Sequence, residues 1–160
     1  MLNITYVYLD KQKDKYFRQA LDEYAKRISK YARFTEKIIK PEALPDGPSQ
    51  TLIDAALEKE AHNALSACPK GAYKIALCVE GKSLSSESFA KLFDKVTTSG
   101  KSDICFFVGS SYGLSETLKK QCDERISFSP MTFPHGLFGV MLAEQIYRAM
   151  TILGGEKYHK

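Results

Sequence analysis

The sequence lacks several features that define whole classes of protein. No stretch approaches the ~18 consecutive apolar residues of a membrane-spanning helix. The first nine residues have no basic segment and meet Asp10 at once, which is typical of a first β-strand and not of a secretion signal. The sequence also has no internal repeat and no low-complexity tract. These absences favour one globular domain, residues 1–160, in the cytoplasm.

Cysteine is scarce, and its spacing does not match the common metal motifs. The four cysteines are Cys68, Cys78, Cys105 and Cys122, and no two stand at the short spacing of a zinc site. Cys78 and Cys105 fall inside apolar runs that are typical of buried strands. We therefore expect four reduced thiols in the core, and no bound metal.

The positive charge is modest and unevenly distributed. The net charge is +4, but residues 1–40 hold ten Lys or Arg against five Asp or Glu. Residues 14–31 combine an apolar side at helical spacing with a basic side. The apolar side is Tyr16, Phe17, Ala20, Leu21, Tyr24, Ile28 and Tyr31, and the basic side is Arg18, Lys26, Arg27, Lys30 and Arg33. Two interpretations stay open, a solvated surface helix and a surface that tracks RNA phosphates.

Strands and helices alternate along the chain. Apolar runs predict strands at 3–9, 34–39, 73–79, 103–108 and 126–128. Helical periodicity predicts helices at 14–31, 50–66, 86–98, 115–122 and 135–153. This order predicts an α/β fold with a mainly parallel sheet flanked by helices.

Two predicted strands end in turns rich in glycine and serine. They are Glu80–Ser86 and Gly109–Ser115, in which Ser85 and Ser115 are suited to cap the following helices. Ligands of open α/β sheets bind beyond the carboxyl ends of the strands, so these turns are expected to line one crevice. The second turn lacks the P-loop lysine and the dinucleotide fingerprint, which disfavours a nucleoside triphosphate or NAD. Simple strand-to-helix connections remain the alternative.

The last predicted helix is apolar around most of its circumference. Between Leu137 and Leu153 the polar residues form one narrow stripe, which is Glu144, Gln145, Arg148 and Thr151. One sheet covers an arc of somewhat over ~100°, and the apolar arc here is about twice that. The second covering surface is either another helix of the same chain or a second copy. We favour a homodimer packed through this helix.

Four segments together carry a resemblance to a known family. They are Val108–Leu114, Ser127–His135, Ala143–Ala149 and the ending Tyr158–Lys160. In this order they closely resemble the RlmH family, also called YbeA, of bacterial 23S rRNA methyltransferases in the SPOUT superfamily. The resemblance covers the whole chain. It implies a SPOUT α/β knot, in which the C-terminal part forms a trefoil knot, and a homodimer.

The resemblance also implies a cofactor and a substrate. S-adenosylmethionine would lie in the knot, contacted by the residues that match the family pattern. These are Leu77, Gly109, Phe128, Ser129, Pro130, Met131, Thr132 and Phe133. The implied substrate is pseudouridine 1915 in helix 69 of 23S rRNA, methylated at N3 within the assembled ribosome.

The implied reaction needs little covalent chemistry from the protein. The sulfonium is an activated methyl donor, so positioning of the reactants can contribute ~7–11 kcal/mol. N3 of the base carries a proton at neutral pH, so a proton acceptor, or a donor to the ring carbonyls, would help. The candidates are Tyr158 and His159 on the tail, with His135 and Arg148 behind them. For His135 a purely structural role at the start of its helix is an equal alternative.

Two positions depart from the family pattern. Gly109-Ser110 stands where the family usually has Gly-Gly, and Gly139 stands where it commonly has Arg. The first change is tolerable if position 110 does not need a positive φ. Two other functions stay open, a non-catalytic RNA-binding or ribosome-binding dimer and an unknotted α/β domain that binds another nucleotide.

Overall fold

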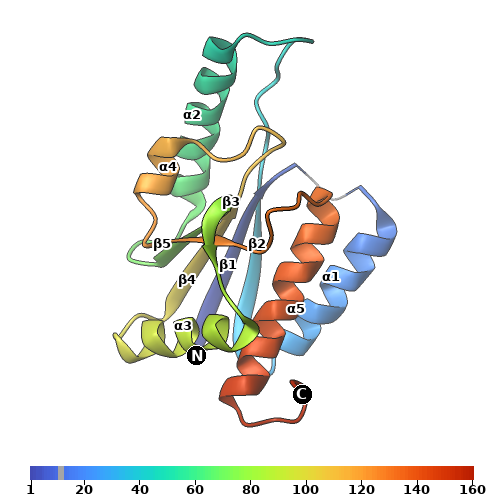
Figure 1. Ribbon diagram of the computed structural model, residues 1–160, viewed down its shortest axis with the longest axis vertical. Coiled ribbons are helices and arrows are strands. Elements are labelled where there is room, and N and C mark those ends of the chain that lie inside the picture. The colour runs from blue at the N-terminus through green and yellow to red at the C-terminus, as the bar shows by residue number, and fades with distance from the viewer. Residues whose placement is uncertain (11–12) are drawn as a thin grey trace.

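The computed structural model describes residues 1–10 and 13–160, and its centre is a five-stranded parallel sheet (Figure 1). The strands run in the order β2-β1-β4-β3-β5. They are β1 (Leu2–Leu9), β2 (Ala32–Ile39), β3 (Tyr73–Ser83), β4 (Asp103–Val108) and β5 (Glu124–Ser127). The helices are α1 (Lys15–Ile28), α2 (Gln50–Ala67), α3 (Ser86–Thr98), α4 (Glu116–Lys120) and α5 (His135–Leu153). The α/β fold with a parallel sheet is confirmed.

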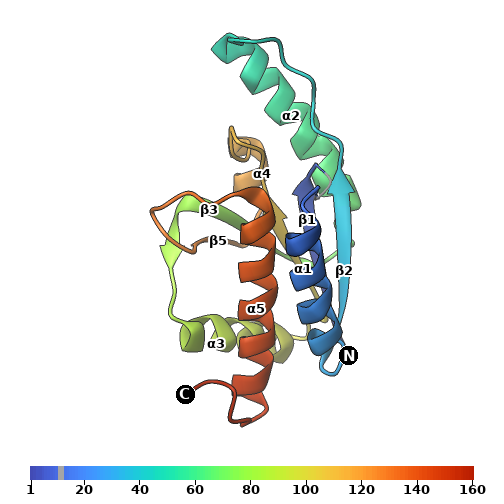
Figure 2. The same ribbon diagram turned by 90° about the vertical axis from the view of Figure 1, so that its right-hand side faces the viewer.

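Helices cover both faces of the sheet. Inward side chains of alternate strand residues, among them Ile4 and Phe106, form one core with α1, α3 and α5. The other face, with Val7 and Phe107, packs on α2 and α4. Figure 2 shows α5 beside α1 on the first face, with α3 across the lower part of that face. Buried strands of this kind have apolar residues on both sides, as parallel sheets require.

All ten predicted elements are present, and β3 and α1 differ most in extent. β3 continues to Ser83, although a turn was predicted after residue 79. The pairing shifts at a bulge, so that both Leu77 and Lys82 lie opposite Ile126 of β5. Gly81 permits this, because a Cβ there would lie 2.5 Å from the Ile126 carbonyl carbon. α1 ends at Ile28, three residues earlier than predicted.

The first helix is less basic on its outer side than its sequence indicates. Leu21 and Ile28 are buried as predicted, but Tyr16 is 64% exposed, so its assignment to the apolar side is wrong. Its ring packs edge-on against Phe17 in the first turn of α1. Arg18 was assigned to the solvated side, and instead its guanidinium bridges α1 to Glu36 of β2. That contact neutralises one of the predicted basic side chains.

Helices of the same chain cover much of α5. α1 packs along one side of α5, and α3 contacts α5 across its lower part (Figure 2). Helices of the same chain, one of the two predicted alternatives, therefore cover part of the large apolar arc of α5. Leu137 and Met141 remain half-buried on the outer side, and Leu153 is 46% exposed. The homodimer stays a prediction.

All four cysteines are free thiols. Cys105 is fully buried in β4, as predicted, whereas Cys68, Cys78 and Cys122 are only half-buried. The expectation of a fully buried position is therefore wrong for these three, although Cys68 and Cys122 pack against the edge of the core. No helix in residues 1–10 and 13–160 is long and apolar enough to span a membrane.

Candidate active site

A cavity of about 280 Å³ lies at the carboxyl ends of β3 and β4. Its wall combines the end of β3, the turn after β4, the loop after β5 and the start of α5. The turn after β4 lines this crevice, as predicted, whereas of the predicted turn Glu80–Ser86 only Glu80 does, because residues 80–83 continue β3. Of the residues implied as cofactor contacts, those on the wall are Leu77, Gly109, Phe128, Ser129, Met131, Thr132 and Phe133. Pro130 is exposed and is not part of the wall.

The turn after β4 folds tightly back on itself. A Cβ at Gly109 would lie 2.3 Å from the carbonyl carbon and oxygen of Gly113, so a side chain there has no room. The Gly113 amide donates to the Ser110 carbonyl at 2.8 Å, and Gly113 has a φ of +83°. Ser110 itself does not have a positive φ, since Asp10 is the one non-glycine residue with that conformation in the described chain. Serine at position 110 is therefore unstrained.

The loop after β5 is held by its own short-range bonds. The Ser127 hydroxyl donates to the Ser129 carbonyl at 3.1 Å, and the Met131 amide donates to the Ser129 hydroxyl at 3.0 Å. The ring of Phe128 packs on that of Phe138 in α5, with centroids 5.0 Å apart. The loop is thus anchored by one aromatic side chain and by its internal bonds, and five of its residues line the cavity, which are Phe128, Ser129, Met131, Thr132 and Phe133.

One ion pair belongs to the cavity wall. Lys119 of α4 donates to Glu80 of β3, and to Glu116 at 3.2 Å. Burial disfavours the charged ammonium, but these carboxylates raise the pKa of Lys119 above its ordinary value. The hydrogen bond from Lys119 lowers the pKa of Glu80. Both charges therefore persist at neutral pH. Across residues 1–10 and 13–160, no group of three His, Cys, Asp or Glu side chains is placed to hold a metal ion.

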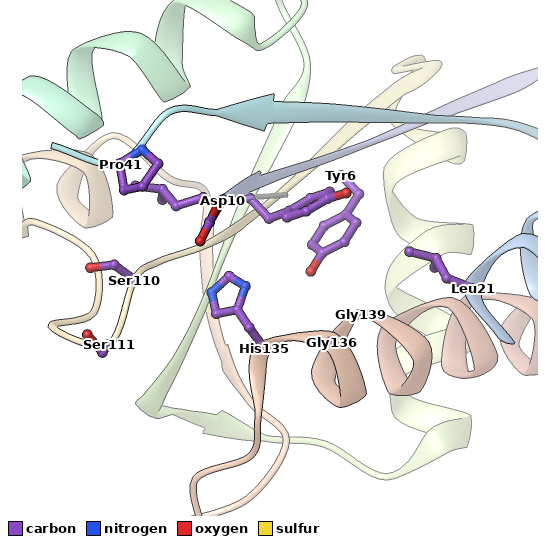
Figure 3. Close-up of a pocket in the computed structure, with 11 residues that line it drawn as sticks. Tyr6, Asp10, Leu21, Pro41, Ser110, Ser111, His135, Gly136 and Gly139 are labelled. Atoms are coloured by element: carbon purple, nitrogen blue, oxygen red, sulfur yellow. The ribbon is translucent and has the colours of Figure 1, made fainter. Parts of the chain in front are cut away.

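His135 links the turn after β4 to the start of α5. Its Nε2 donates to the carbonyl of Gly109, because a carbonyl oxygen only accepts. In the neutral ring Nδ1 is then an acceptor. His135 also lines a second cavity of about 320 Å³, which lies between β1, α1 and α5 (Figure 3). Its structural role is confirmed, and it contacts both cavities.

The other three catalytic candidates lie together at the far end of α5. Arg148 Nε donates to Glu144 at 3.0 Å, and the Tyr158 hydroxyl donates to the same carboxylate at 3.1 Å. The Arg148 guanidinium also stacks on the Tyr158 ring, 4.8 Å from its centroid. His159 receives a hydrogen bond from Arg148 at Nδ1 and donates from Nε2 to Glu87 of α3, at 3.2 and 2.9 Å. The tail is therefore ordered against α3 and α5.

These contacts define the protonation of the tail. Burial, followed by the neighbouring Tyr24 and Glu144, raises the pKa of Tyr158 to about 12. Tyr158 is therefore a hydrogen-bond donor at neutral pH and not a base. Because Arg148 only donates, His159 Nδ1 is unprotonated and Nε2 carries the proton. The hydrogen bond from His159, aided by backbone donors, lowers the pKa of Glu87 to about 2.

One chain does not bring its four catalytic candidates together. His135 is the first residue of α5 and Arg148 lies thirteen residues along it. At ~1.5 Å per residue the two positions are about 20 Å apart. Tyr158 and His159 stay with Arg148, so the tail of a chain is remote from the cavities of that same chain.

The structure explains why glycine is suited to position 139. Gly139 is buried, and a Cβ there would lie 3.2 Å from the Tyr6 hydroxyl. The aromatic side chain of β1 thus reaches into the space beside α5 that a larger residue at 139 would enter. Tyr6 and Gly139 therefore fit each other, and no arginine is available at this point.

Several wall residues lie outside the segments that the sequence predicted to line the crevice. They include Lys119 and Phe138 around the first cavity, and Tyr6 in the second. Glu80 and Ser111 belong to the two segments that were predicted there. Lys119 and Tyr6 had no such signal, because only the packing of α4 and α5 on the sheet directs them to the cavities.

Comparison with known proteins gives consistent matches along the chain. The family model described as "Predicted SPOUT methyltransferase" matches residues 2–159. Ribosomal RNA large subunit methyltransferase H of Limosilactobacillus reuteri is 43% identical, and that of Clostridium botulinum is 42% identical. Each alignment covers 99% of this chain and all of the relative.

Among solved structures, the fold is similar to a tRNA (m1G37) methyltransferase of Aquifex aeolicus. The TM-score is 0.52 at 17% sequence identity, over 99% of this chain and 73% of that one. At this identity the likeness concerns the fold alone.

Proposed function

This chain belongs to the SPOUT methyltransferase family, within its ribosomal RNA large subunit methyltransferase H branch, and from that premise we propose its reaction. The protein transfers a methyl group from S-adenosylmethionine to N3 of pseudouridine 1915 in helix 69 of 23S rRNA. It acts in the cytoplasm on the assembled ribosome. The observation that carries the proposal is the cavity walled by the turn after β4 and the loop after β5.

The cavity residues fit S-adenosylmethionine in size and chemistry. The cavity has a volume of about 280 Å³, which is close to the ~300 Å³ lower bound of small-molecule sites. Gly109 keeps the turn free of side chains, so backbone groups can approach a ligand closely. Phe128, Met131 and Phe133 offer apolar surface for an adenine ring, and the Lys119–Glu80 pair offers both charges to a zwitterionic amino acid. When bound, the cofactor supplies an activated methyl group.

The residues of the chain then act by positioning and by proton transfer. The anchored loop and the tight turn fix the ligand, and such alignment can contribute ~7–11 kcal/mol to the rate. His135 holds its ring by the bond to Gly109 and directs an acceptor nitrogen toward the region shared by the two cavities. It is suited to accept the N3 proton of the target base. Tyr158, as a neutral donor, is suited to stabilise charge on a ring carbonyl.

A homodimer is part of this proposal, because the tail and the cavities lie about 20 Å apart in one chain. Two copies of α5 packed antiparallel across a two-fold axis bring the tail of each protomer to the cavities of the other. The half-buried Leu137 and Met141 support this, since the residues of a single chain do not cover these apolar side chains completely. Arg148, Tyr158 and His159 then act on the substrate of the partner.

The trefoil knot is proposed on the same grounds. The loop after β5 and the start of α5 lie against the turn after β4, and together they wall the cavity. β5 also approaches β3 so closely that Gly81 has no room for a side chain. These contacts support a C-terminal segment that is threaded through the loop between β3 and β4.

Methyl transfer from labelled S-adenosylmethionine to ribosomes tests the proposal. We expect transfer to assembled ribosomes from cells without this modification, and much less to naked helix 69 RNA. The reason is that a chain of 160 residues with net charge +4 has little surface with which to select one nucleotide. The non-catalytic dimer predicts RNA binding without methyl transfer, indifferent to the cofactor and to His159→Ala. That result would overturn the proposal.

A further inference from the structure

A tyrosine side chain of β1 forms part of the second cavity wall. Tyr6 is 1% exposed and is one of the lining residues. Figure 3 shows its hydroxyl directed toward the space between His135 and Gly139. A ligand in this cavity that accepts a hydrogen bond is therefore within reach of the hydroxyl.

The cavity has the size and lining of a small-ligand site. Its volume is about 320 Å³, and its wall joins the end of β1, Leu21 of α1, Pro41 after β2, the turn after β4 and the first turns of α5. The rings of Tyr6 and Tyr8 stack with centroids 4.5 Å apart and form an aromatic side wall. Gly136 and Gly139 leave the facing side of α5 open. The volume of about 320 Å³ leaves room for a flat ring beside these two surfaces.

The polar groups of the wall favour a neutral ligand. Tyr6 contributes a hydroxyl, and burial raises its pKa, so that it stays a donor. Ser110 and Ser111 contribute groups that both donate and accept. Asp10 is the one charged side chain of the described wall, and no Lys or Arg belongs to it. This lining disfavours a phosphate and suits a ring that carries carbonyl oxygens.

The two cavities adjoin each other. Ser110, Ser111 and His135 line both of them. A ring held in the second cavity therefore lies next to a ligand in the first, and His135 forms part of the wall of both cavities. Enzymes that modify a base in RNA or DNA take it out of the stack into such a pocket.

We propose that the cavity between Tyr6, His135 and Gly139 binds the flipped-out uracil ring of the target nucleotide, with the Tyr6 hydroxyl donating to a ring carbonyl. This inference rests on the proposed function, because the ring is the methyl acceptor of that reaction. Gly139 is the residue that gives access, since a Cβ there would press on the Tyr6 hydroxyl at 3.2 Å. Tyr6 and Gly139 are therefore specificity-determining residues for a uracil-type base.

Uridine titration of the S-adenosylhomocysteine-saturated protein tests this inference. The amide signals of Gly136 and Gly139 are followed by NMR, with adenosine as the competing base type. We expect uridine to shift these signals saturably, and adenosine to shift them less because a purine is larger. Tyr6→Phe is expected to weaken uridine binding about 2- to 10-fold, the range for one neutral hydrogen bond. Tyr73→Phe removes a hydroxyl bonded to Glu124 at the other end of the sheet and is the matched control.

A double variant shows whether Gly139 acts through Tyr6. If Gly139→Ala weakens binding by displacing the hydroxyl, Tyr6→Phe combined with Gly139→Ala is no weaker than the poorer single variant. Independent effects would multiply and contradict the assigned role. Absence of any shift at Gly136 and Gly139 up to the solubility limit of uridine would overturn the inference alone. Failure of S-adenosylhomocysteine to bind would overturn the proposed function, and this inference with it.

Discussion

Gly109 and His135 together fix the geometry of the turn after β4. The absence of a Cβ at Gly109 lets the chain return onto Gly113, and the imidazole of His135 secures the Gly109 carbonyl from α5. Neither contact buries much apolar surface. Their effect is to hold a backbone edge open on one side for a ligand, which is how glycine turns commonly serve binding sites.

Gly109→Ala is expected to destabilise the fold by about 1–3 kcal/mol, the usual cost of overpacking, and to weaken S-adenosylhomocysteine binding. The added methyl would lie 2.3 Å from the Gly113 backbone, so the turn must move. Urea unfolding and calorimetric titration measure the two effects. Gly154→Ala is the control, because Gly154 has a φ of −79° at the end of α5 and its nearest Cβ contact would be 3.3 Å. Equal stability and affinity in both variants would contradict the conclusion that the turn has no room for a side chain at Gly109.

The contact between His159 and Glu87 predicts an acid-sensitive tail. The folded pKa of Glu87 is lowered from 4.5 to about 2. A lowered carboxyl pKa stabilises the folded state above the unfolded value, and this contribution is lost as the pH falls from about 4.5 toward 2. We expect the urea midpoint of the wild type to fall across this window more steeply than that of Glu87→Gln. Glu58→Gln, at an exposed carboxyl of α2, serves as the control and should keep the wild-type slope.

At the scale of single elements, α5 carries the two halves of the proposed site at its opposite ends. Its first residue reaches the cavities, and its last turns hold the tail. Glu144 is central to the second half, since its carboxylate accepts from Arg148, Tyr158 and Gln145. The Gln145 amide oxygen in turn accepts from Ser86 of α3 at 2.7 Å.

Glu144→Ala is expected to lower stability by about 1.5–3 kcal/mol, the range for hydrogen bonds to a charged group. It leaves the Arg148 guanidinium and the Tyr158 hydroxyl without their shared acceptor, so the tail should also be cleaved faster by protease. Urea unfolding and limited proteolysis test both effects. Asp94→Ala, at an exposed acid of α3, provides the comparison. A tail that remains resistant in Glu144→Ala would contradict this role.

The sequence predicted every strand and helix, because the segments with helical spacing of apolar residues are clearly separated from the short apolar runs of the strands. It could not predict the bulge that extends β3 to Ser83, which depends on pairing with β5. The rule that ligands bind at carboxyl edges located the first cavity. The second cavity was missed, because Tyr6 in β1 shows only an apolar strand pattern and its meeting with Gly139 is a tertiary contact.

At the scale of the whole molecule, the proposed function requires two chains for each working site. A protomer with His135→Ala has a damaged cavity, and one with His159→Ala has a damaged tail. Each variant alone should be nearly inactive, whereas mixed dimers should regain activity because one of their two sites has an intact cavity and an intact tail. Methyl transfer after subunit exchange measures this.

Mixing His159→Ala with Tyr158→Phe is the control and should restore no activity, because both substitutions are in the tail. Failure of the first mixture, with dimers formed, would rule out the shared site.

The most direct measurement locates the transferred methyl group. Ribosomes from cells that lack the modification are incubated with this protein and labelled S-adenosylmethionine, and the modified nucleotide is identified by mass spectrometry. We predict methyl on N3 of the helix 69 pseudouridine, and no label when His159→Ala replaces the wild type. Label on another nucleotide, or no label from a protein that binds the cofactor, would contradict the proposed function.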